Sequence, residues 1–223
     1  RLMVRTRERA FASGSVAAGP GWLWLMAAML AGSVAAAAWV LNPVSALFVF
    51  LGAFFYACVY TVWLKRRSAW NIVIGGLAGS FAVLAGAAAV DPAIGPQGLI
   101  LALVLLLWTP PHFWSLAIAY QREYGAAGIP MLPVVVGIPR AARIVLLSTI
   151  ALVLASLLPM FHGAGPAYLA GAAIGGVYFL IKARALDRKP DRGTAIGSFL
   201  ASLLQLSLLL AGAWLLSGFF GIL

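Results

Sequence analysis

The stretch LWTPPHFWSLAIAYQREYGAAGIPMLP, residues 107–133, decides how the rest of the chain is interpreted. It begins among hydrocarbon side chains, carries adjacent prolines at Pro110 and Pro111, and then places His112 between aromatic residues. Adjacent prolines remove backbone donors and clash with the preceding turn, so we expect the helix to kink or break there. In a bilayer such a break is tolerated where protein or a wet cavity surrounds it. A broken helix with a histidine is therefore the first candidate for a functional site.

The composition indicates a membrane protein. The chain has 223 residues, of which 64% are hydrophobic and 9% charged, and its mean hydropathy is +1.04. Soluble domains carry about 25% charged residues, and apolar runs of about 20 residues, the length that crosses a bilayer, recur along this chain. We expect an all-α polytopic transmembrane helix bundle in a lipid bilayer and no nucleic-acid partner. Cys58 is the single cysteine, so no disulfide within the chain is possible.

Seven apolar spans are predicted, separated by turn signals rich in Gly, Pro, Asn and charged residues. Their approximate bounds are 22–41, 44–64, 71–90, 98–120, 142–159, 166–182 and 196–217.

Charge supports this count of spans. When the spans cross alternately, all fifteen basic residues fall on one face, and the opposite face carries only Asp91 and His162. By the positive-inside rule, the basic face lies in the cytoplasm. We therefore predict a multi-pass protein of the bacterial cytoplasmic (inner) membrane, with its basic loops and active site facing the cytoplasm. Orientation alone is the competing explanation for most of these charges.

Lys65, Arg66 and Arg67 form the most informative basic cluster. They follow one span without a break, and Asn71 opens the next span. Positive charge at a helix end that faces another helix start suits a multiply charged oxyanion. The Gly- and Ala-rich spans at 71–90 and 166–182 are better explained by close helix packing.

The other polar candidates are His112 and Glu123. An ionisable residue within a span is a functional hypothesis by default, so His112 is a candidate to ligate a heme iron or move a proton; the alternative is a structural hydrogen bond. Glu123 is either an ion-pair partner or a ligand of a divalent cation that bridges to a phosphate. One carboxylate is too few for Mg²⁺. Asp187 and Asp191 lie on the same face, although their surroundings favour a solvated loop.

Four stretches together carry a family resemblance: YTVWLKR at 60–66, NIVIGGLAG at 71–79, WTPPHFW at 108–114 and YGAAGIPMLP at 124–133. They resemble the protoheme IX farnesyltransferase (heme O synthase) family of intramembrane prenyltransferases, and the resemblance spans the whole chain. Residues 3–9 look like the segment that follows the family's first aspartate-rich loop. The chain departs from the family at Ala10, which is usually Pro, and at Glu123, which is usually Asp.

The resemblance implies a nine-helix bundle. Residues 1–223 would then be a single transmembrane prenyltransferase domain that lacks two N-terminal spans and the Asn/Asp-rich loop before Arg1. Mg²⁺ would be held by Glu123 together with carboxylates upstream of Arg1. The chain taken alone is therefore expected to lack a complete active site.

The implied reaction transfers a farnesyl group from farnesyl diphosphate to a vinyl group of heme b, giving heme O for terminal oxidase assembly. Heme A synthase and oxidase assembly proteins are the implied protein partners. The implied catalytic residues are Lys65, Arg66, Glu123 and Tyr124. The implied diphosphate-binding residues are Arg5, Arg9, Lys65, Arg66 and Asn71. His112 and Trp114 would contact heme, and an aromatic pocket for the prenyl cation would comprise Tyr60, Trp63, Trp108 and Phe113.

Two other functions remain open at this stage. The first is a related intramembrane prenyltransferase with another acceptor, such as a quinone or a chlorophyll-type ring. The second is a transporter or channel whose broken helix at Pro110 and Pro111 forms a site in mid-membrane. Against the transporter, the sequence shows no internal repeat, and its polar residues gather at one face.

Overall fold

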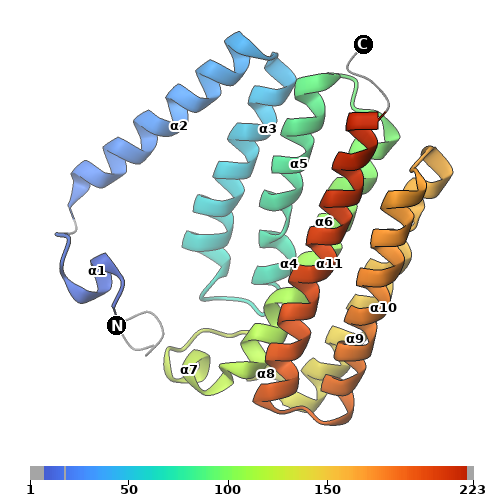
Figure 1. The fold of residues 1–223 in the computed structure, drawn as a ribbon. Helices are drawn as coiled ribbons and strands as arrows, with labels where there is room; N and C mark the ends of the chain where they lie inside the picture. Colours follow the sequence, from blue (N-terminus) through green and yellow to red (C-terminus); the bar gives the residue numbers. More distant parts are fainter. Residues whose placement is uncertain (1–7, 18, 220–223) are drawn as a thin grey trace.

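The structure is a computed structural model, and it describes residues 8–17 and 19–219. This part of the chain is built from helices joined by short turns (Figure 1). The elements are α1 (Ala10–Ser13), α2 (Pro20–Val40), α3 (Pro43–Phe54), η2 (Phe55–Leu64), α4 (Asn71–Gly75), α5 (Leu77–Val90), α6 (Pro96–Ala119), α7 (Gln121–Ala126), α8 (Leu132–Val136), α9 (Ile138–Ala155), η3 (Leu158–His162), α10 (Pro166–Arg188) and α11 (Arg192–Phe219).

Seven helical spans in the described residues are long and apolar enough to cross a membrane, which confirms the predicted all-α polytopic bundle. The spans are Pro20–Val40, Pro43–Leu64, Asn71–Val90, Pro96–Ala119, Ile138–His162, Pro166–Arg188 and Arg192–Ala213. Proline lies in the first turn of several of them, where its missing N–H has no helical partner to lose. The side chain of Asn42 accepts from Ser45 N at 2.9 Å and donates to Ala88 O at 2.7 Å, so one residue caps α3 and joins it to α5.

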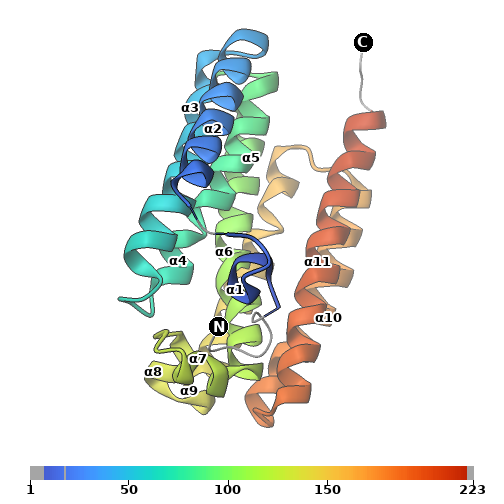
Figure 2. The same ribbon diagram turned by 90° about the vertical axis from the view of Figure 1, so that its left-hand side faces the viewer.

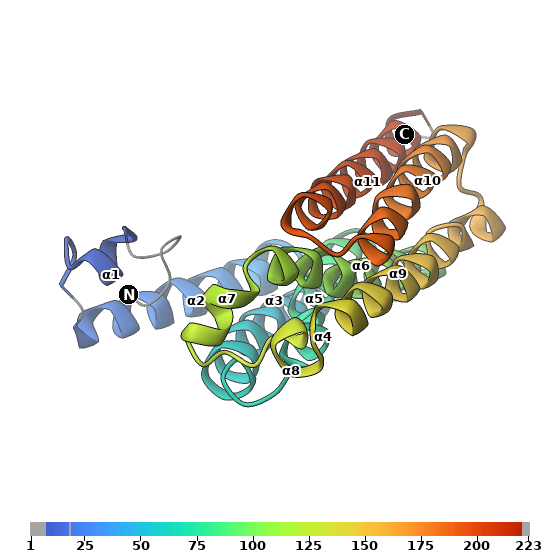
Figure 3. The ribbon, with the colours of Figure 1, turned by 90° about the horizontal axis from the view of Figure 1, so that it is seen from below.

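The helix α6 lies at the centre of the bundle. It packs against α5 on one side and against α9 and α11 on the other, as Figures 2 and 3 show from two directions. Helices α10 and α11 approach closely because glycine lies between them: a Cβ at Gly171 would be 2.7 Å from Leu208 O. This confirms that glycine in α10 serves packing. Helix α2 contacts α3 but leans away from the bundle, and its apolar surface is largely exposed (Figure 1).

The sequence predicted a kink or a break at Pro110 and Pro111. A break is wrong, because α6 continues through both residues, and a kink stays a prediction. Both prolines are buried by neighbouring helices. Nearby hydroxyls bond to helix carbonyls: Thr109 Oγ1 donates to Leu105 O at 2.9 Å, and Ser115 Oγ donates to Pro111 O at 2.7 Å. The carbonyls that lack an N–H donor because of these prolines are those of residues 106 and 107, whereas the two hydroxyls bond other carbonyls. Burial against neighbouring helices is therefore what supports the helix across the prolines. The chain instead leaves α6 at Tyr120.

One end of the bundle, which we call the basic end, gathers the loop 65–70, helices α7 and α8, the start of α9 and the turn between α10 and α11 (Figure 1). The cluster at residues 65–67 and the basic residues at 122, 140, 143 and 188–192 belong to these segments. The fold therefore brings together charges that are far apart in the sequence. It also places them at the same end as Glu123 and Tyr124.

Candidate active site

The segment that leads into the basic end is a π-helix. Residues Phe55–Leu64 form η2, whose last turn is closed by Lys65 N donating to Tyr60 O at 2.9 Å. Long π-helical segments are rare and π-turns are frequent at functional sites. The wide turn aligns Tyr56, Tyr60 and Lys65: the two tyrosine ring centroids lie 5.9 Å apart, and Lys65 Nζ lies 5.8 Å from the Tyr60 centroid. An α-helical pattern of residues does not predict this conformation.

Gly75 explains where the Tyr60 ring lies. A Cβ added at Gly75 would be 2.6 Å from Tyr60 Cδ2, a distance that real Cβ atoms do not tolerate. The ring therefore rests directly on the backbone of α4. Lys65 thus lies over a ring whose position depends on a glycine in the next helix, and Gly75 has a role beyond general packing.

Asn71 secures the loop that carries the basic cluster. It is fully buried, and its Nδ2 donates to Ser68 O at 2.7 Å. Its Oδ1 is buried without a hydrogen-bond partner among the described residues. A buried acceptor without a donor costs folding free energy. One of the two amide N–H donors is used in the turn, and this bond supports a positioning role for Asn71. Its predicted contact with a diphosphate stays a prediction.

A buried cluster then joins this loop to the rest of the basic end. Ile72, Trp114, Tyr124 and Leu186 belong to it, and Tyr60 packs against it from η2. The sequence separations are large, since these residues come from α4, α6, α7 and α10. The structure therefore brings Tyr60, Trp114 and Tyr124 together, as their assignment to one site requires. Trp114 also lines an apolar cavity of about 490 Å³ with Trp70, Val73, Pro110, Leu132 and Val136 among its walls.

Glu123 lies in the first turn of α7 and is half-buried. It lines a polar hollow of about 500 Å³ together with Tyr120, Arg122 and Arg192. Arg192 enters from the start of α11, and its guanidinium carbon lies 5.4 Å from the centroid of the Tyr120 ring. From the sequence, Arg192 was one of the fifteen basic residues on the cytoplasmic face and no candidate for the site. Its position at a helix start on the basic face was the available signal, but the pairing with Tyr120 depends on the fold.

The other acidic residues of the basic end have structural partners. Asp187 Oδ1 accepts from Arg143 Nε at 2.8 Å. Asp191 Oδ1 accepts from the backbone N–H of Thr194 at 2.8 Å, and this bond holds the pKa of Asp191 below its ordinary value. Among the described residues, no three His, Cys, Asp or Glu side chains form a group that could hold a metal ion. These residues alone therefore do not fit a Mg²⁺ site, since Glu123 is the single carboxylate lining its hollow.

His112 is buried between α6 and α11. Its Nδ1 lies 2.7 Å from Ser202 Oγ, and its ring stacks on Trp108 with centroids 4.1 Å apart. Trp108 Nε1 donates to Ser202 O at 2.8 Å, so both side chains are tied to the same serine. These contacts support a structural role, joining two spans by hydrogen bonds. The predicted contact of His112 with heme stays a prediction without support from this geometry.

The four aromatic residues predicted to enclose a prenyl cation do not share one cluster. Tyr60 packs at the basic end, whereas Trp108 belongs to a second cluster with Phe179 and Leu209. Trp63 is 54% exposed and Phe113 is 37% exposed. The π-helix explains part of this separation, because its wider turn places Tyr60 and Trp63 on different faces.

Arg9, the described member of the two N-terminal arginines predicted to bind the diphosphate, is not joined to this site. Arg9 is exposed at the start of α1, and no described hydrogen bond links it to the basic cluster. Arg5 lies outside the described residues.

Seven spans with basic residues gathered at one end define a multi-pass intramembrane protein. Residues 1–204 match the UbiA prenyltransferase family, and the chain belongs to that family. The resemblance inferred from the sequence motifs is thereby confirmed.

Three relatives illustrate the similarity. Protoheme IX farnesyltransferase 2 of Paramagnetospirillum magneticum (strain ATCC 700264 / AMB-1) is 62% identical over 209 residues, covering 94% of this chain and 73% of the relative. Protoheme IX farnesyltransferase 1 of the same strain is 50% identical over 210 residues, covering 94% and 74%. Protoheme IX farnesyltransferase of Shewanella denitrificans (strain OS217 / ATCC BAA-1090 / DSM 15013) is 40% identical over 209 residues, covering 93% and 69%. No solved structure gives a significant match.

Proposed function

We propose that the protein transfers a farnesyl group from farnesyl diphosphate to a vinyl group of heme b, giving heme O. Three relatives from two organisms bear the name protoheme IX farnesyltransferase, and the first of them is 62% identical to this chain. The observation that carries the proposal structurally is the basic cluster at the end of η2, with Lys65 Nζ held 5.8 Å from the Tyr60 ring centroid. A cation beside an aromatic face suits a reaction in which an anion leaves and an allylic cation forms.

The chemistry follows from that pair of groups. When the bond between farnesyl C1 and oxygen breaks, the electron pair leaves with the diphosphate, and the positive charges of Lys65 and Arg66 stabilise it. The face of Tyr60 stabilises the allylic cation, a contact worth about 0.5–2 kcal/mol. The vinyl π electrons form the new carbon–carbon bond. Water then adds to the cation beside the porphyrin ring and loses a proton, which gives a hydroxyethylfarnesyl group.

The described residues do not by themselves make up a Mg²⁺ site. We assign Tyr124 and Asn71 to positioning the basic end, because both are buried there. Glu123 and Arg192 line the adjacent polar hollow, where Arg192 adds positive charge. The involvement of Arg5 and Arg9 in binding the diphosphate also belongs to this proposal.

The apolar cavity beside Trp114 is the site that we assign to the porphyrin. Its volume is about 490 Å³, its walls include Trp70 and Trp114, and it adjoins the cluster that contains Tyr124. A large, flat, apolar acceptor needs such a cavity next to the charged site, since apolar walls bury most of a ligand's surface.

The transporter hypothesis loses its main support because α6 is continuous through Pro110 and Pro111. The seven spans indicate a multi-pass membrane protein. We further propose that it resides in the bacterial inner membrane with the basic end in the cytoplasm, following the positive-inside rule. Heme A synthase and terminal oxidase assembly proteins are the partners that this function implies.

The test uses the protein expressed from its native gene, including whatever precedes Arg1, in membranes supplied with farnesyl diphosphate and heme b. Lys65→Ala and Arg66→Ala are each expected to lower turnover by roughly a hundredfold, the usual effect of removing one stabilising charge. Arg140→Ala is the matched control, because Arg140 is exposed at the same end of the bundle. Turnover that is unchanged in both variants, with normal protein levels, would remove the diphosphate assignment.

A further inference from the structure

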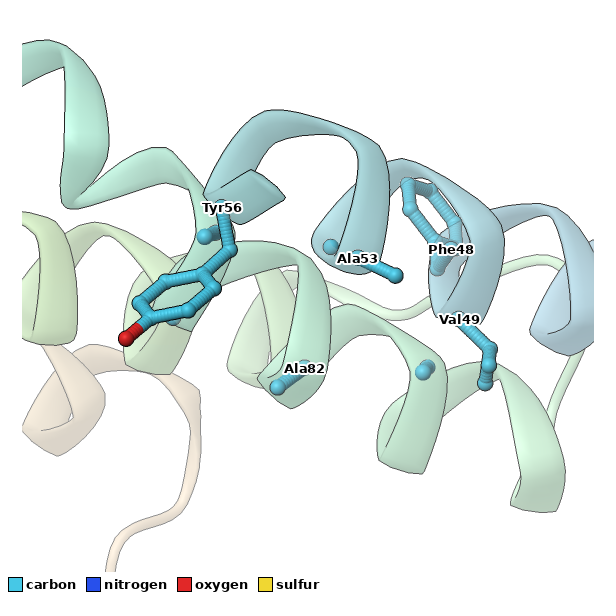
Figure 4. A pocket seen from close by; sticks show the side chains of 9 residues that line it. Phe48, Val49, Ala53, Tyr56 and Ala82 are labelled. Carbon is cyan, nitrogen blue, oxygen red and sulfur yellow. The ribbon is translucent and has the colours of Figure 1, made fainter. Parts of the chain in front are cut away.

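A second apolar hollow lies between α3, η2 and α5, away from the residues assigned above. Its volume is about 550 Å³, and its walls carry no charged residue. Figure 4 shows Tyr56 at one end of this groove and Phe48 with Val49 at the other, while Ala53 and Ala82 lie between them on opposite helices. The lining residues are Phe48, Val49, Gly52, Ala53, Tyr56, Ala78, Gly79, Ala82 and Ala85.

Two side-chain contacts link the Tyr56 end of the groove to the basic end. The ring of Tyr56, which forms one end of the groove, lies 5.9 Å from the ring of Tyr60. The Tyr60 ring in turn lies 5.8 Å from Lys65 Nζ. A single helix therefore carries a cationic end, then two aromatic faces, then an apolar groove.

This order is complementary to one kind of ligand, an amphiphile with a multiply charged anionic head and an extended hydrocarbon tail. The positive charge at residues 65–67 is complementary to the anionic head, and the uncharged groove is complementary to the hydrocarbon tail. Small residues on α3 and α5 keep the groove open: Ala53 and Ala82 present methyl groups where larger side chains would fill the space. Larger side chains line the groove again at the end away from Tyr56, where Phe48 and Val49 lie.

We propose that this groove holds the isoprenoid tail of the prenyl diphosphate, and that Phe48 and Val49 set the length of tail accepted. The inference rests on the proposed prenyl transfer and adds to it a tail site distinct from the aromatic residues that the sequence suggested. Ala53 and Ala82 are specificity-determining residues in this account, because their small size admits the chain between the helices.

The experiment compares geranyl, farnesyl and geranylgeranyl diphosphates with the protein expressed from its native gene and purified in detergent. Binding of each diphosphate is measured by calorimetry, and transfer to heme b by chromatography. Ala53→Leu and Ala82→Leu should weaken farnesyl diphosphate binding by roughly tenfold or more, because each buried methylene contributes a factor of about 4. Their binding of geranyl diphosphate should change much less. Val49→Ala and Phe48→Ala should improve binding of geranylgeranyl diphosphate.

Ala57→Leu is the control, because Ala57 is exposed on η2 and does not line the groove. Thermal melts of every variant establish that it is folded. If the folded leucine variants keep the parent's preference among the three diphosphates, the tail assignment is overturned, and a membrane lipid or another helix is the better occupant. Binding is measured separately from transfer, so the two proposals can fail independently. If the parent protein binds farnesyl diphosphate but does not modify heme, the proposed reaction is refuted. The binding preferences of the variants still test the groove in that case.

Discussion

Replacing Gly75 by alanine tests whether the Tyr60 ring is positioned by the backbone of α4. The added Cβ would lie 2.6 Å from Tyr60 Cδ2 and 3.1 Å from Cγ, whereas carbon atoms at their best separation are about 3.5–4.0 Å apart. The overlap is therefore about 1 Å, and relieving it moves the ring or the helix. Overpacking of this kind costs about 1–3 kcal/mol.

The matched control is Gly86→Ala in α5, where nothing lies within 4 Å of the added atom. Alanine in an unobstructed helical position gains up to about 1 kcal/mol over glycine. Gly75→Ala should therefore melt below the parent or close to it, Gly86→Ala at or above it, and the two variants should differ by about 1–3 kcal/mol. Thermal unfolding in detergent, followed by tryptophan fluorescence, measures the difference.

A double variant separates this contact from a general loss of fold. Tyr60→Ala removes the ring that the new methyl group meets, so Gly75→Ala should cost less in that background, with a coupling energy of about 0.5–3 kcal/mol. Farnesyl transfer by Gly75→Ala should fall by roughly tenfold, because Lys65 loses its aromatic neighbour, a change of about 1.4 kcal/mol. If Gly75→Ala is as stable as Gly86→Ala, or if the two changes at 60 and 75 are simply additive, the contact does not position the ring.

Three further predictions concern the bundle itself. Ser202→Ala should destabilise the protein by about 1–3 kcal/mol in a thermal melt, because it strands His112 Nδ1 in the interior; an unchanged melting temperature would show that this bond is not structural. Gly171→Ala should cost about 1–3 kcal/mol, since the added Cβ would meet Leu208 O at 2.7 Å, and a neutral effect would mean that α10 and α11 separate easily. Asp191→Ala should lower the melting temperature at pH 7. The folded pKa of Asp191 is depressed by the Thr194 N–H, so its contribution persists above the ordinary pKa of about 4 and disappears as the pH falls through the lowered value. A difference from the parent that persists at pH 2 would contradict this assignment.

The sequence was sufficient for the spans and for the basic end, because both follow from local composition. Apolar runs of bilayer length and the one-sided placement of Lys and Arg survive uncertainty in any single boundary. The break at Pro110 and Pro111 was predicted wrongly, since the local rule for proline omits the neighbouring helices that bury both residues. Tertiary packing decided that conformation.

The site was predictable only in part for a similar reason. Lys65, Tyr60, Trp114 and Tyr124 stand in recognisable motifs, and the fold brings the three aromatic side chains among them together. The π-helix at 55–64 was not foreseeable from an α-helical periodicity, and it separates Trp63 from Tyr60. The pairing of Arg192 with Tyr120 joins residues from α11 and the end of α6. Such a contact has no local signal.

The central claim is that heme b receives a farnesyl group at the site next to Lys65. The most direct measurement is extraction of heme from membranes that express the protein from its native gene, followed by chromatography and mass spectrometry. The account predicts a heme carrying a hydroxyethylfarnesyl group with the parent and with Arg140→Ala, and unmodified heme b with Lys65→Ala. Unmodified heme b from the folded parent, or full conversion by Lys65→Ala, would contradict it.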